Sequence, residues 1–144
     1  MTGIDKTNTL SFAIAGIQVI ESCLFELKQP LGPNEQIDYE LTIEQKVHST
    51  DHLFNVICRV VIIHKNTSEE LARFSALCGF IIENIDDFYV KETKEHQFPI
   101  PILTMFNSVT ISTVRGMMVE RFRGTHLHGC VLPVVDPKTI TGSN

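Results

Sequence analysis

The sequence lacks the features that mark membrane, secreted and nucleic-acid-binding proteins. Its longest nearly uncharged run, Phe98 to Val114, is short for a bilayer span and is interrupted by two prolines, an asparagine and several hydroxyls. The first ten residues, MTGIDKTNTL, show no basic segment followed by an apolar one, so we predict no secretory signal and expect a cytoplasmic protein. The net charge is −5 with scattered Lys and Arg, so nucleic acid is not an expected partner.

Motifs of redox and catalytic chemistry are also missing. The cysteines lie far apart without a CxxC pair, which favours reduced thiols packed as small hydrophobic residues. They are Cys23, Cys58, Cys78 and Cys130. The chain has no glycine-rich phosphate loop, and no nucleophile with a base can be recognised. We therefore predict that the protein is not an enzyme and binds no cofactor.

One short segment offers side chains that ligate metals. The sequence HLHGC places His126, His128 and Cys130 two residues apart, so a strand would project all three from one face, and imidazole with thiolate suits zinc. No fourth ligand is visible, and the pattern is also typical of a loop after a helix. We therefore predict no metal site.

The composition is that of one folded domain. Of the 144 residues, 43% are hydrophobic and 20% are charged, close to the average for globular proteins. This length provides a real core but little room for a second unit. We expect a single domain spanning residues 1–144, with flexible tails at residues 1–10 and 137–144.

Four segments have the patterns of β-strands. Residues 36–47 alternate between apolar and polar side chains, as a half-buried strand does. Its polar face carries Asp38, Glu40 and Glu44, either as a solvated surface or as a docking patch for a basic partner. The other three segments are rich in Val, Ile and Phe. The predicted strands are Ser11–Leu27, Gln36–Val47, Leu53–His64 and Leu71–Ile85.

The connections and lengths of these strands predict a topology. Parallel neighbours would need a crossover of about a dozen residues, so short connections favour an antiparallel meander in which consecutive strands pair. The strands are long against the usual length of about 5 to 6 residues. We therefore expect either bulges near Gly16 and Gly79 or a sheet that extends into a partner subunit.

The stretch FPIPILTMFNSVTISTVRGMMVERFRGT, residues 98–125, is predicted to be coil followed by helix. A sheet with one apolar face needs a covering layer, which only the C-terminal third can supply. Pro99 and Pro101 hold the chain extended before the first turn, and Gly124 is a natural terminator. The predicted sheet-facing arc consists of Phe106, Val109, Thr113, Val114, Met117, Met118 and Arg121. The predicted fold class is α+β: a four-stranded antiparallel sheet with one long C-terminal helix packed on one face.

Two further features lie in and before this helix. A stripe of small residues four positions apart lets another helix approach closely; its members are Ser108, Ser112 and Gly116. Before the helix, residues 86–101 form a long crossover that carries Phe88, Tyr89 and Phe98. These rings either form a wall that binds extended apolar segments or tuck under the loop as ordinary packing.

Several segments resemble SecB, the bacterial protein-export chaperone. DHLFNVICRVVIIHKNTSEELARFSALCGFIIENID, from Asp51, is similar to the central SecB strands. IPILTMFNSVTISTVRGMMVERFRGT followed by LPVVD resembles the main SecB helix, its closing Arg-Gly-Thr and the Pro-Val step after it. FAIAGIQVIESCLFEL resembles the first SecB strand. The resemblance covers residues 12–136 and rests on pattern and a few motifs, because the family has no catalytic signature.

The resemblance implies a fold, an assembly and a binding site. It implies helices on one face of a four-stranded antiparallel sheet, and a tetramer built as a dimer of dimers, in which the stripe of small residues is an oligomer interface. Unfolded polypeptide is then expected in long surface grooves bounded by the sheet, the helix and the crossover. The client-binding residues that the resemblance implies are Phe74, Ala76, Cys78, Phe88, Tyr89 and Phe98.

The sequence also departs from the SecB pattern. SecB docks the translocation motor SecA through acidic residues on its sheet, and Glu26 matches one of them. Ser22 and Ser75 fall where the family has two others, so docking of SecA is a weaker expectation. The last helix of the family is not expected, because the chain ends soon after the Pro-Val step.

We therefore interpret the sequence as that of a cytoplasmic, ATP-independent holdase that binds unfolded polypeptides and acts in protein export. It is expected to form a homotetramer without inserting into a membrane. One alternative is a chaperone of the same fold dedicated to a single client, such as an unstable antitoxin. The other is a small enzyme whose active site forms only between subunits. A broad holdase protects several unrelated unfolded proteins, a dedicated module protects one, and an enzyme protects none.

Overall fold

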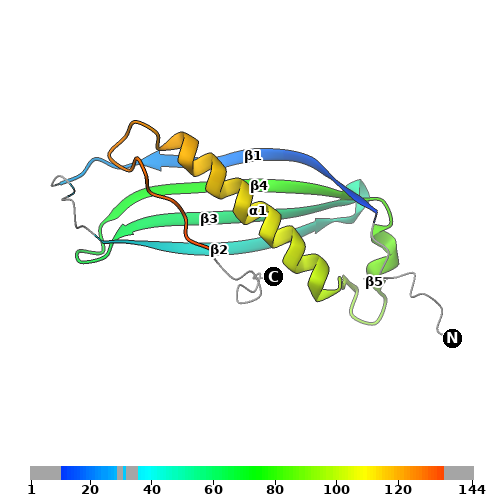
Figure 1. The fold of residues 1–144 in the computed structure, drawn as a ribbon. Coiled ribbons are helices and arrows are strands. Elements are labelled where there is room, and N and C mark those ends of the chain that lie inside the picture. The colour runs from blue at the N-terminus through cyan, green and yellow to red at the C-terminus, as the bar shows by residue number, and fades with distance from the viewer. Residues whose placement is uncertain (1–10, 29–30, 32–35, 135–144) are drawn as a thin grey trace.

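The fold is a four-stranded antiparallel sheet with one long helix across one of its faces (Figure 1). The computed structural model describes residues 11–28, 31 and 36–134, so the tails expected at residues 1–10 and 137–144 lie outside the described residues. The elements are β1 (Phe12–Leu24), β2 (Ile37–His48), β3 (Leu53–His64), β4 (Glu70–Ile82) and α1 (Ile100–Arg121). This architecture confirms the predicted fold class.

The order of the strands differs from the predicted meander at one place. β2, β3 and β4 pair consecutively, but β1 lies beside β4, which gives the order β1-β4-β3-β2. The prediction treated residues 28–35 as a hairpin connection, whereas β1 ends at Leu24 and β2 begins at Ile37, so the connection is longer than a hairpin needs. As a result, β1 and β2 are the two edge strands.

β1 contains two bulges that keep its apolar residues on one face. Ala15 and Ile20 have no partner in the register with β4, and each shifts the alternation of side chains by one residue. Four apolar residues therefore pair with β4 residues that face the helix; they are Phe12, Ile14, Ile17 and Val19. The bulge expected near Gly16 is present, whereas Gly79 pairs regularly with β3.

α1 begins at the two prolines and ends just before a glycine. Pro99 is the extended N-cap residue, and Pro101 lies in the first turn, where its missing N–H is not needed. The N–H groups of Ile102 and Leu103 donate to the Pro99 carbonyl at 3.0 and 3.2 Å. Beyond the helix, Gly124 adopts a φ of 76°, which favours glycine and ends the helical path.

The face that α1 turns to the sheet is rotated from the predicted arc. Its buried residues are Phe106, Asn107, Thr110, Ile111, Val114 and Met118, while Val109, Thr113 and Met117 are only half-buried. Two polar residues are buried because their hydrogen bonds are satisfied. Gln45 Nε2 donates to Asn107 Oδ1 at 2.8 Å, and the Thr110 hydroxyl donates to the Phe106 carbonyl at 2.8 Å. A prediction based on apolarity alone cannot find such positions.

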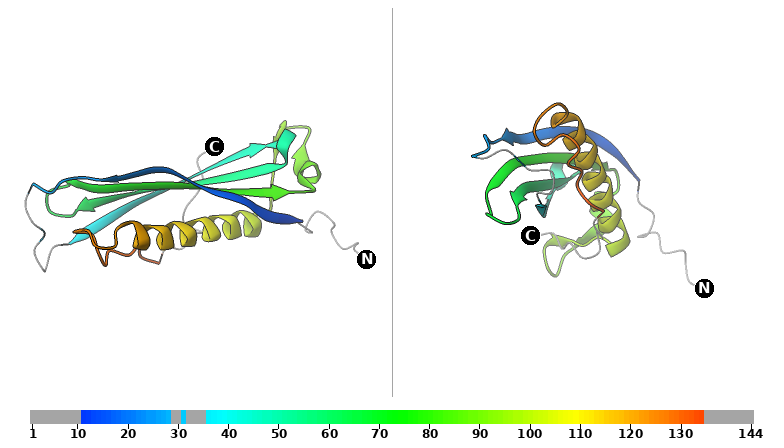
Figure 2. Two further views of the ribbon diagram at one scale, coloured as in Figure 1. Left: turned by 90° about the horizontal axis from the view of Figure 1, so that it is seen from above. Right: turned by 60° about the vertical axis from the view of Figure 1, so that its left-hand side comes forward.

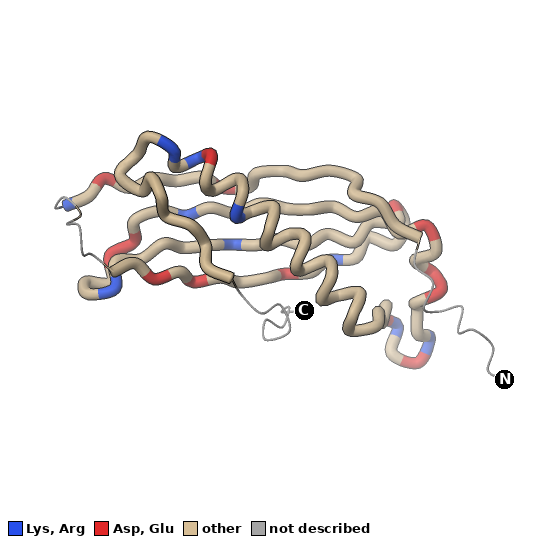
Figure 3. The backbone as a smooth tube through the Cα atoms, in the orientation of Figure 1, with Lys and Arg blue, Asp and Glu red and all other residues tan. Residues whose placement is uncertain are grey.

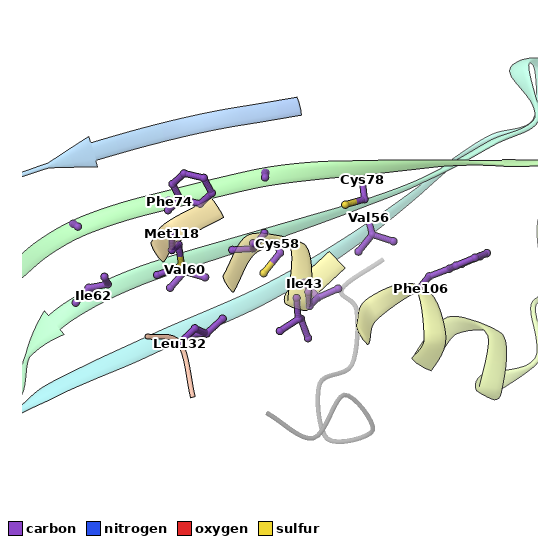
Figure 4. Packing of buried hydrophobic residues seen from close by; sticks show 14 of the residues in the cluster. Ile43, Val56, Cys58, Val60, Ile62, Phe74, Cys78, Phe106, Met118 and Leu132 are labelled. Carbon is purple, nitrogen blue, oxygen red and sulfur yellow. The ribbon is translucent and has the colours of Figure 1, made fainter. Parts of the chain in front are cut away.

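The core is one apolar layer between the sheet and α1 (Figure 4). The Phe106 ring stacks on Phe80 with 4.3 Å between the centroids, and it lies 5.2 Å from Phe54 and 5.3 Å from Phe12. Phe106 therefore ties the helix to β1, β3 and β4. The other residues labelled in Figure 4 are Ile43, Val56, Cys58, Val60, Ile62, Phe74, Cys78, Met118 and Leu132.

The chain beyond α1 turns back and crosses the sheet on the side of the helix. Figure 1 shows residues 122–134, in orange and red, running from the β1 side towards β2, and Figure 2 shows this segment on the same side of the sheet as α1. Leu127 and Leu132 from this segment are buried in the core. The segment thus covers apolar surface that α1 leaves uncovered.

α1 is long and apolar enough, by length and composition alone, to cross a membrane. A core helix passes the same test, because it must be apolar where it meets a sheet. Phe106, Val114 and Met118 are buried between α1 and the sheet. Packing against the sheet therefore accounts for the apolar residues on the buried face of the helix.

Candidate functional site

The candidate site is the crossover between β4 and α1, which we call the aromatic loop and define as residues 85–99. It consists of a 3₁₀ helix (Ile85–Phe88) and a hairpin of two short strands, β5 (Tyr89–Val90) and β6 (Glu95–His96). The Gln97 N–H donates to the Phe88 carbonyl at 2.8 Å and closes the loop. The loop projects from one end of the sheet, beside the N-terminus of α1 (Figure 1).

The three aromatic side chains predicted to bind clients lie in different environments. Phe88 is only 4% exposed and packs on Phe98, with 5.0 Å between the centroids. Phe98 is half-buried and meets Phe54 of β3 edge-on at 5.1 Å. Tyr89, by contrast, is 44% exposed and meets the His96 ring at 5.2 Å. Phe88 and Phe98 therefore anchor the loop to the sheet, whereas Tyr89 faces solvent.

A surface cavity of about 350 Å³ opens in the aromatic loop. Its lining residues are Asp87, Phe88, Tyr89, Val90, Gln97, Phe98 and Pro99. Ring faces, a valine and a proline attract apolar side chains, and Gln97 supplies polar groups that can meet a main chain. The cavity can accept an apolar side chain from an extended polypeptide.

The three β4 residues predicted to bind clients are buried in the core. Phe74, Ala76 and Cys78 are at most 2% exposed and point to the face of the sheet that α1 covers. They cannot contact a client while the helix stays in place, so we leave them out of the candidate site. The alternation of the strand located their face but did not show what covers it. In the same layer, burial raises the pKa of the Cys58 thiol to about 12, which keeps it neutral and unreactive.

An exposed apolar surface that the sequence patterns did not single out lies on β1. We call it the β1 strip; its residues are Phe12, Ile14, Ile17 and Val19, which are between 41% and 52% exposed. The strip follows an edge strand, and Figure 3 shows no charged residue along this part of β1. Strict alternation would have placed Ile17 and Val19 on the opposite face from Phe12, so the bulge at Ala15 hides the strip from a prediction based on sequence.

The predicted stripe of small residues lies on the outer side of α1. Ser108 is half-buried, and Ser112 and Gly116 are exposed. A Cβ added at Gly116 would meet no atom within 4 Å. A shallow cavity of about 430 Å³ is lined by Ser108, Val109, Ser112 and Thr113. The helix thus offers a surface without large side chains, pointing away from its own sheet.

The three positions related to motor docking do not share one acidic surface. Glu26 is exposed just after β1. Ser22 points to the helix side, where its hydroxyl accepts a hydrogen bond from Arg121 Nε at 2.6 Å. Ser75 is only 3% exposed. A carboxylate at position 22 would meet Arg121, and one at position 75 would be buried, so neither position is arranged to present a charge to a partner.

The acidic face of β2 is partly neutralised. The Glu44 carboxylate accepts a hydrogen bond from Arg59 Nη1 at 2.7 Å and lies 3.5 Å from Lys46 Nζ. The Arg59 guanidinium holds the pKa of Glu44 below its usual range. Asp38 and Glu40 are exposed further along the strand (Figure 3). The face is therefore a solvated surface with mixed charges.

The histidines and the cysteine considered for metal binding do not converge. His126 and His128 are exposed in turns, and His128 Nδ1 accepts the Gly124 N–H at 3.1 Å. Cys130 is half-buried and its sulfur accepts a hydrogen bond from the Tyr39 hydroxyl. Within the described part of the chain, no group of three His, Cys, Asp or Glu side chains is placed to hold a metal ion.

Comparisons with known proteins find similar structures but no similar sequences. No family model and no curated protein sequence matches this chain. Among solved structures, it is similar to the SecB-like chaperone Rv1957 of Mycobacterium tuberculosis, in complex with a ChAD peptide from the antitoxin HigA1. The match has a TM-score of 0.58 at 15% identity and covers 86% of this chain and 90% of that one. The chain has a SecB-like fold.

A second match among solved structures is weaker. A protein of unknown function from Streptococcus agalactiae covers 88% of this chain and 99% of its own length, with 9% identity and a TM-score of 0.45. Its likeness is too low to support an argument about the site. The resemblance to SecB in the sequence and the match to the SecB-like chaperone thus agree on the fold, and the site has to be argued from its own residues.

Proposed function

We propose that this protein is an ATP-independent chaperone that binds extended segments of unfolded polypeptides at the aromatic loop. The single observation that carries the proposal is the exposed Tyr89 ring beside a cavity with an aromatic lining, on a SecB-like fold. An exposed surface to which several neighbouring apolar side chains contribute, as in the lining of this cavity, is typical of an interaction site. The similar mycobacterial chaperone supports this use of the fold, because it is bound to a peptide.

Binding at such a site is weak for each side chain and strong for the whole client. An aromatic contact contributes about 0.5–1.5 kcal/mol, which allows many sequences to bind and exchange. In an oligomer, several segments of one client engage several loops at once, so avidity exceeds the affinity of one contact. Retention of the client therefore needs no nucleotide, and release follows when the client folds or a partner competes.

The assembly that we propose is a tetramer built as a dimer of dimers. The β1 strip combines an unpaired strand edge with exposed apolar side chains, whereas the other edge strand, β2, carries Asp38, Glu40 and Lys46 on one face. Charged side chains oppose strand addition, so β1 is the edge suited to pairing with a second copy. The stripe of Ser108, Ser112 and Gly116 is the proposed contact between dimers, because small residues let helices approach closely.

The proposal also concerns which clients and which partner proteins this protein binds. A general holdase is the first candidate, because the ring faces that line the cavity can contact apolar side chains in many different sequences. A module dedicated to one client, such as an antitoxin, is the second candidate, and the peptide bound to the mycobacterial protein favours it. SecA docking through Glu26, and with it a role in export, is a further proposal that the positions of Ser22 and Ser75 weaken.

The test is light scattering of several unrelated proteins diluted from denaturant, with and without the chaperone. The variant Tyr89→Ala is compared with Ile81→Ala, a matched control that truncates a similarly exposed side chain on β4. We expect Tyr89→Ala to weaken client binding by about three- to tenfold, as the loss of one aromatic contact predicts. Both variants should keep the thermal midpoint of the parent, because Tyr89 and Ile81 are exposed.

The outcomes separate the candidate functions. Suppression of aggregation for several clients supports the general holdase, and suppression for one client alone supports the dedicated module. If no client is protected, the proposed function fails. If clients are protected equally well by Tyr89→Ala and by the parent, the chaperone activity stands and the aromatic loop is not its site.

A further inference from the structure

A short extended segment after α1 is held against the sheet in an unusual way. We call it the strap and define it as Cys130–Val134. None of its residues belongs to a helix or a strand. It crosses the face of the sheet beside α1 towards β2 (Figures 1 and 2). Its contacts are a guanidinium on its main chain, one buried leucine, and two hydrogen bonds at its cysteine. The Cys130 sulfur accepts one from the Tyr39 hydroxyl, and the Cys130 N–H donates the other to the Leu127 carbonyl at 3.0 Å.

The guanidinium of Arg115 binds the main chain of the strap. Its Nε donates to the Leu132 carbonyl at 2.8 Å, and its Nη2 donates to the Pro133 carbonyl at 2.9 Å. Two donors of one planar group thus meet two successive carbonyls. Because every extended peptide offers such carbonyls, this contact does not depend on the side chains of the segment. Arg115 is half-buried, so a segment that left would have to be replaced by another source of acceptors.

One fully buried apolar side chain anchors the strap, and both of its valines face water. Leu132 is 1% exposed and belongs to the same buried cluster as Val60 and Ile62 (Figure 4). Its neighbours Val131 and Val134 are 49% and 95% exposed. Main-chain hydrogen bonds combined with a single apolar anchor are the way in which proteins bind extended peptides of varied sequence. The strap therefore occupies its place as a bound peptide would.

Two glycines precede the strap, and one of them can act as its pivot. Gly124 and Gly129 have φ values of 76° and 85°, in the left-handed region that glycine adopts without strain. Leu127 lies between them and is buried in the core, so only Gly129 can turn the strap without removing another core side chain. Cys130 is another point at which the strap is held, but the hydrogen bond that its sulfur accepts from the Tyr39 hydroxyl is a weak one. The strap can thus leave the sheet by rotation at Gly129, without displacement of Leu127 and without unfolding of α1.

We infer that the strap is an intramolecular competitor that fills a second client site, formed by Arg115 and the apolar face of β2 and β3. The inference rests on the proposed chaperone function and deepens it. The ligand of this site is an extended polypeptide segment without charged side chains. Two of its main-chain carbonyls accept hydrogen bonds from Arg115, and one side chain similar to leucine in size fills the apolar position. A client segment displaces the strap, gives its carbonyls to Arg115 and places its apolar side chain where Leu132 lies.

The first experiment uses the strap itself as the ligand. A peptide with the sequence HLHGCVLPV, residues 126–134, is titrated under reducing conditions into the parent and into Leu132→Ser. A tethered segment has an effective concentration on the order of millimolar, so the parent should bind the free peptide weakly. Leu132→Ser should bind it at least about tenfold more tightly, because its own strap no longer competes. The matched control Val134→Ser, in which an exposed valine is changed, should behave as the parent.

The second experiment follows the parent chain and does not depend on any variant. Alkylation of the Cys130 thiol is measured by mass spectrometry of the digested protein, with and without reduced, carboxymethylated α-lactalbumin as an unfolded client. Burial raises the pKa of Cys130, so release of the strap should speed its alkylation several-fold, while buried Cys58 and Cys78 stay protected. Alkylation of Cys130 at the same rate with saturating client would overturn the inference.

The two proposals fail in distinguishable ways. If the parent binds no client, the proposed function is lost, yet binding of the strap peptide to Leu132→Ser still decides whether the site exists. If the parent binds clients while folded Leu132→Ser does not bind the strap peptide, the second site is refuted and the aromatic loop remains. Circular dichroism of Leu132→Ser shows whether it is folded, and the alkylation experiment stands alone if it is not.

Discussion

Phe106 on α1 lies nearly parallel to Phe80 on β4, with 4.3 Å between the ring centroids and 21° between the planes. The same ring contacts Phe12 and Phe54, so one side chain holds three strands against the helix. This contact sets the position of α1 and, through Phe54, that of the aromatic loop, because Phe54 also carries Phe98 at 5.1 Å. The candidate site thus depends on the packing of the core.

The first prediction concerns this contact. Phe106→Ala should lower the free energy of unfolding by about 3–5 kcal/mol, because it removes a fully buried ring and leaves a cavity among three others. Phe106→Leu, which keeps much of the volume, should lose clearly less. Urea titration followed by circular dichroism measures both. Equal losses for the two variants would show that the aromatic stacking, rather than the volume, is what matters.

The second prediction tests the register between β1 and β4. Gly16 lies opposite Gly79, but a Cβ added at Gly79 would come within 3.0 Å of Asn55 Oδ1, whereas one added at Gly16 would meet nothing within 4 Å. Gly79→Ala should therefore destabilise the protein by about 1 kcal/mol, and Gly16→Ala should be neutral or slightly stabilising. Adding Asn55→Ala to Gly79→Ala should restore most of the loss. The thermal midpoints of all variants are measured under the same conditions. A lower midpoint for Gly16→Ala would contradict the register between β1 and β4.

Much of the fold could be read from the sequence because its strands are long and regular. The alternation of residues 53–64 located β3 with the bounds that the structure shows, and Phe74, Ala76 and Cys78 were placed correctly on one face of β4. The sequence does not show which element of the fold covers a given face of the sheet. For that reason those three β4 residues were assigned to the site, although α1 buries them.

The features that escaped prediction depend on contacts between distant segments. β1 pairs with β4 because its connection to β2 is longer than a hairpin. The β1 strip is created by the bulge at Ala15, which breaks strict alternation. The strap has no periodicity at all, since its position comes from Arg115, whose partners lie 17 and 18 residues away. In the aromatic loop, sequence identified the rings but not their unequal exposure.

The third prediction is a loss of stability at alkaline pH. Burial raises the pKa of Cys58 to about 12 from a usual value near 9, and that of Tyr39 to about 12 from near 10. The folded state therefore holds protons that the unfolded state has released, so the free energy of unfolding should be constant below about pH 8 and fall above about pH 9. For Cys58 alone the slope is at most about 1.4 kcal/mol per pH unit.

The measurement for this prediction is urea denaturation at several pH values between 7 and about 11. Cys58→Ala serves as the comparison, because it removes one titrating group from the core. Its stability at pH 7 should be lower, since a buried side chain is truncated, but its decline with pH should be shallower than that of the parent. Parallel declines for parent and variant would rule out Cys58 as a contributor.

The last prediction concerns the proposed pairing of β1 with a second copy. Ile17 and Val19 lie on the edge strand and are 49% and 44% exposed, so lysines at both positions would leave the protomer's own core intact. In a paired edge, however, the four added charges of two copies would lie close together and lose hydration. The double variant Ile17→Lys/Val19→Lys should therefore have a smaller solution mass than the parent by light scattering after size exclusion. Ile81→Lys, on the opposite face of the sheet, should leave the mass unchanged and controls for added charge. An unchanged mass for the β1 variant would remove this strand from the interface and would leave the stripe on α1 as the contact to be tested next.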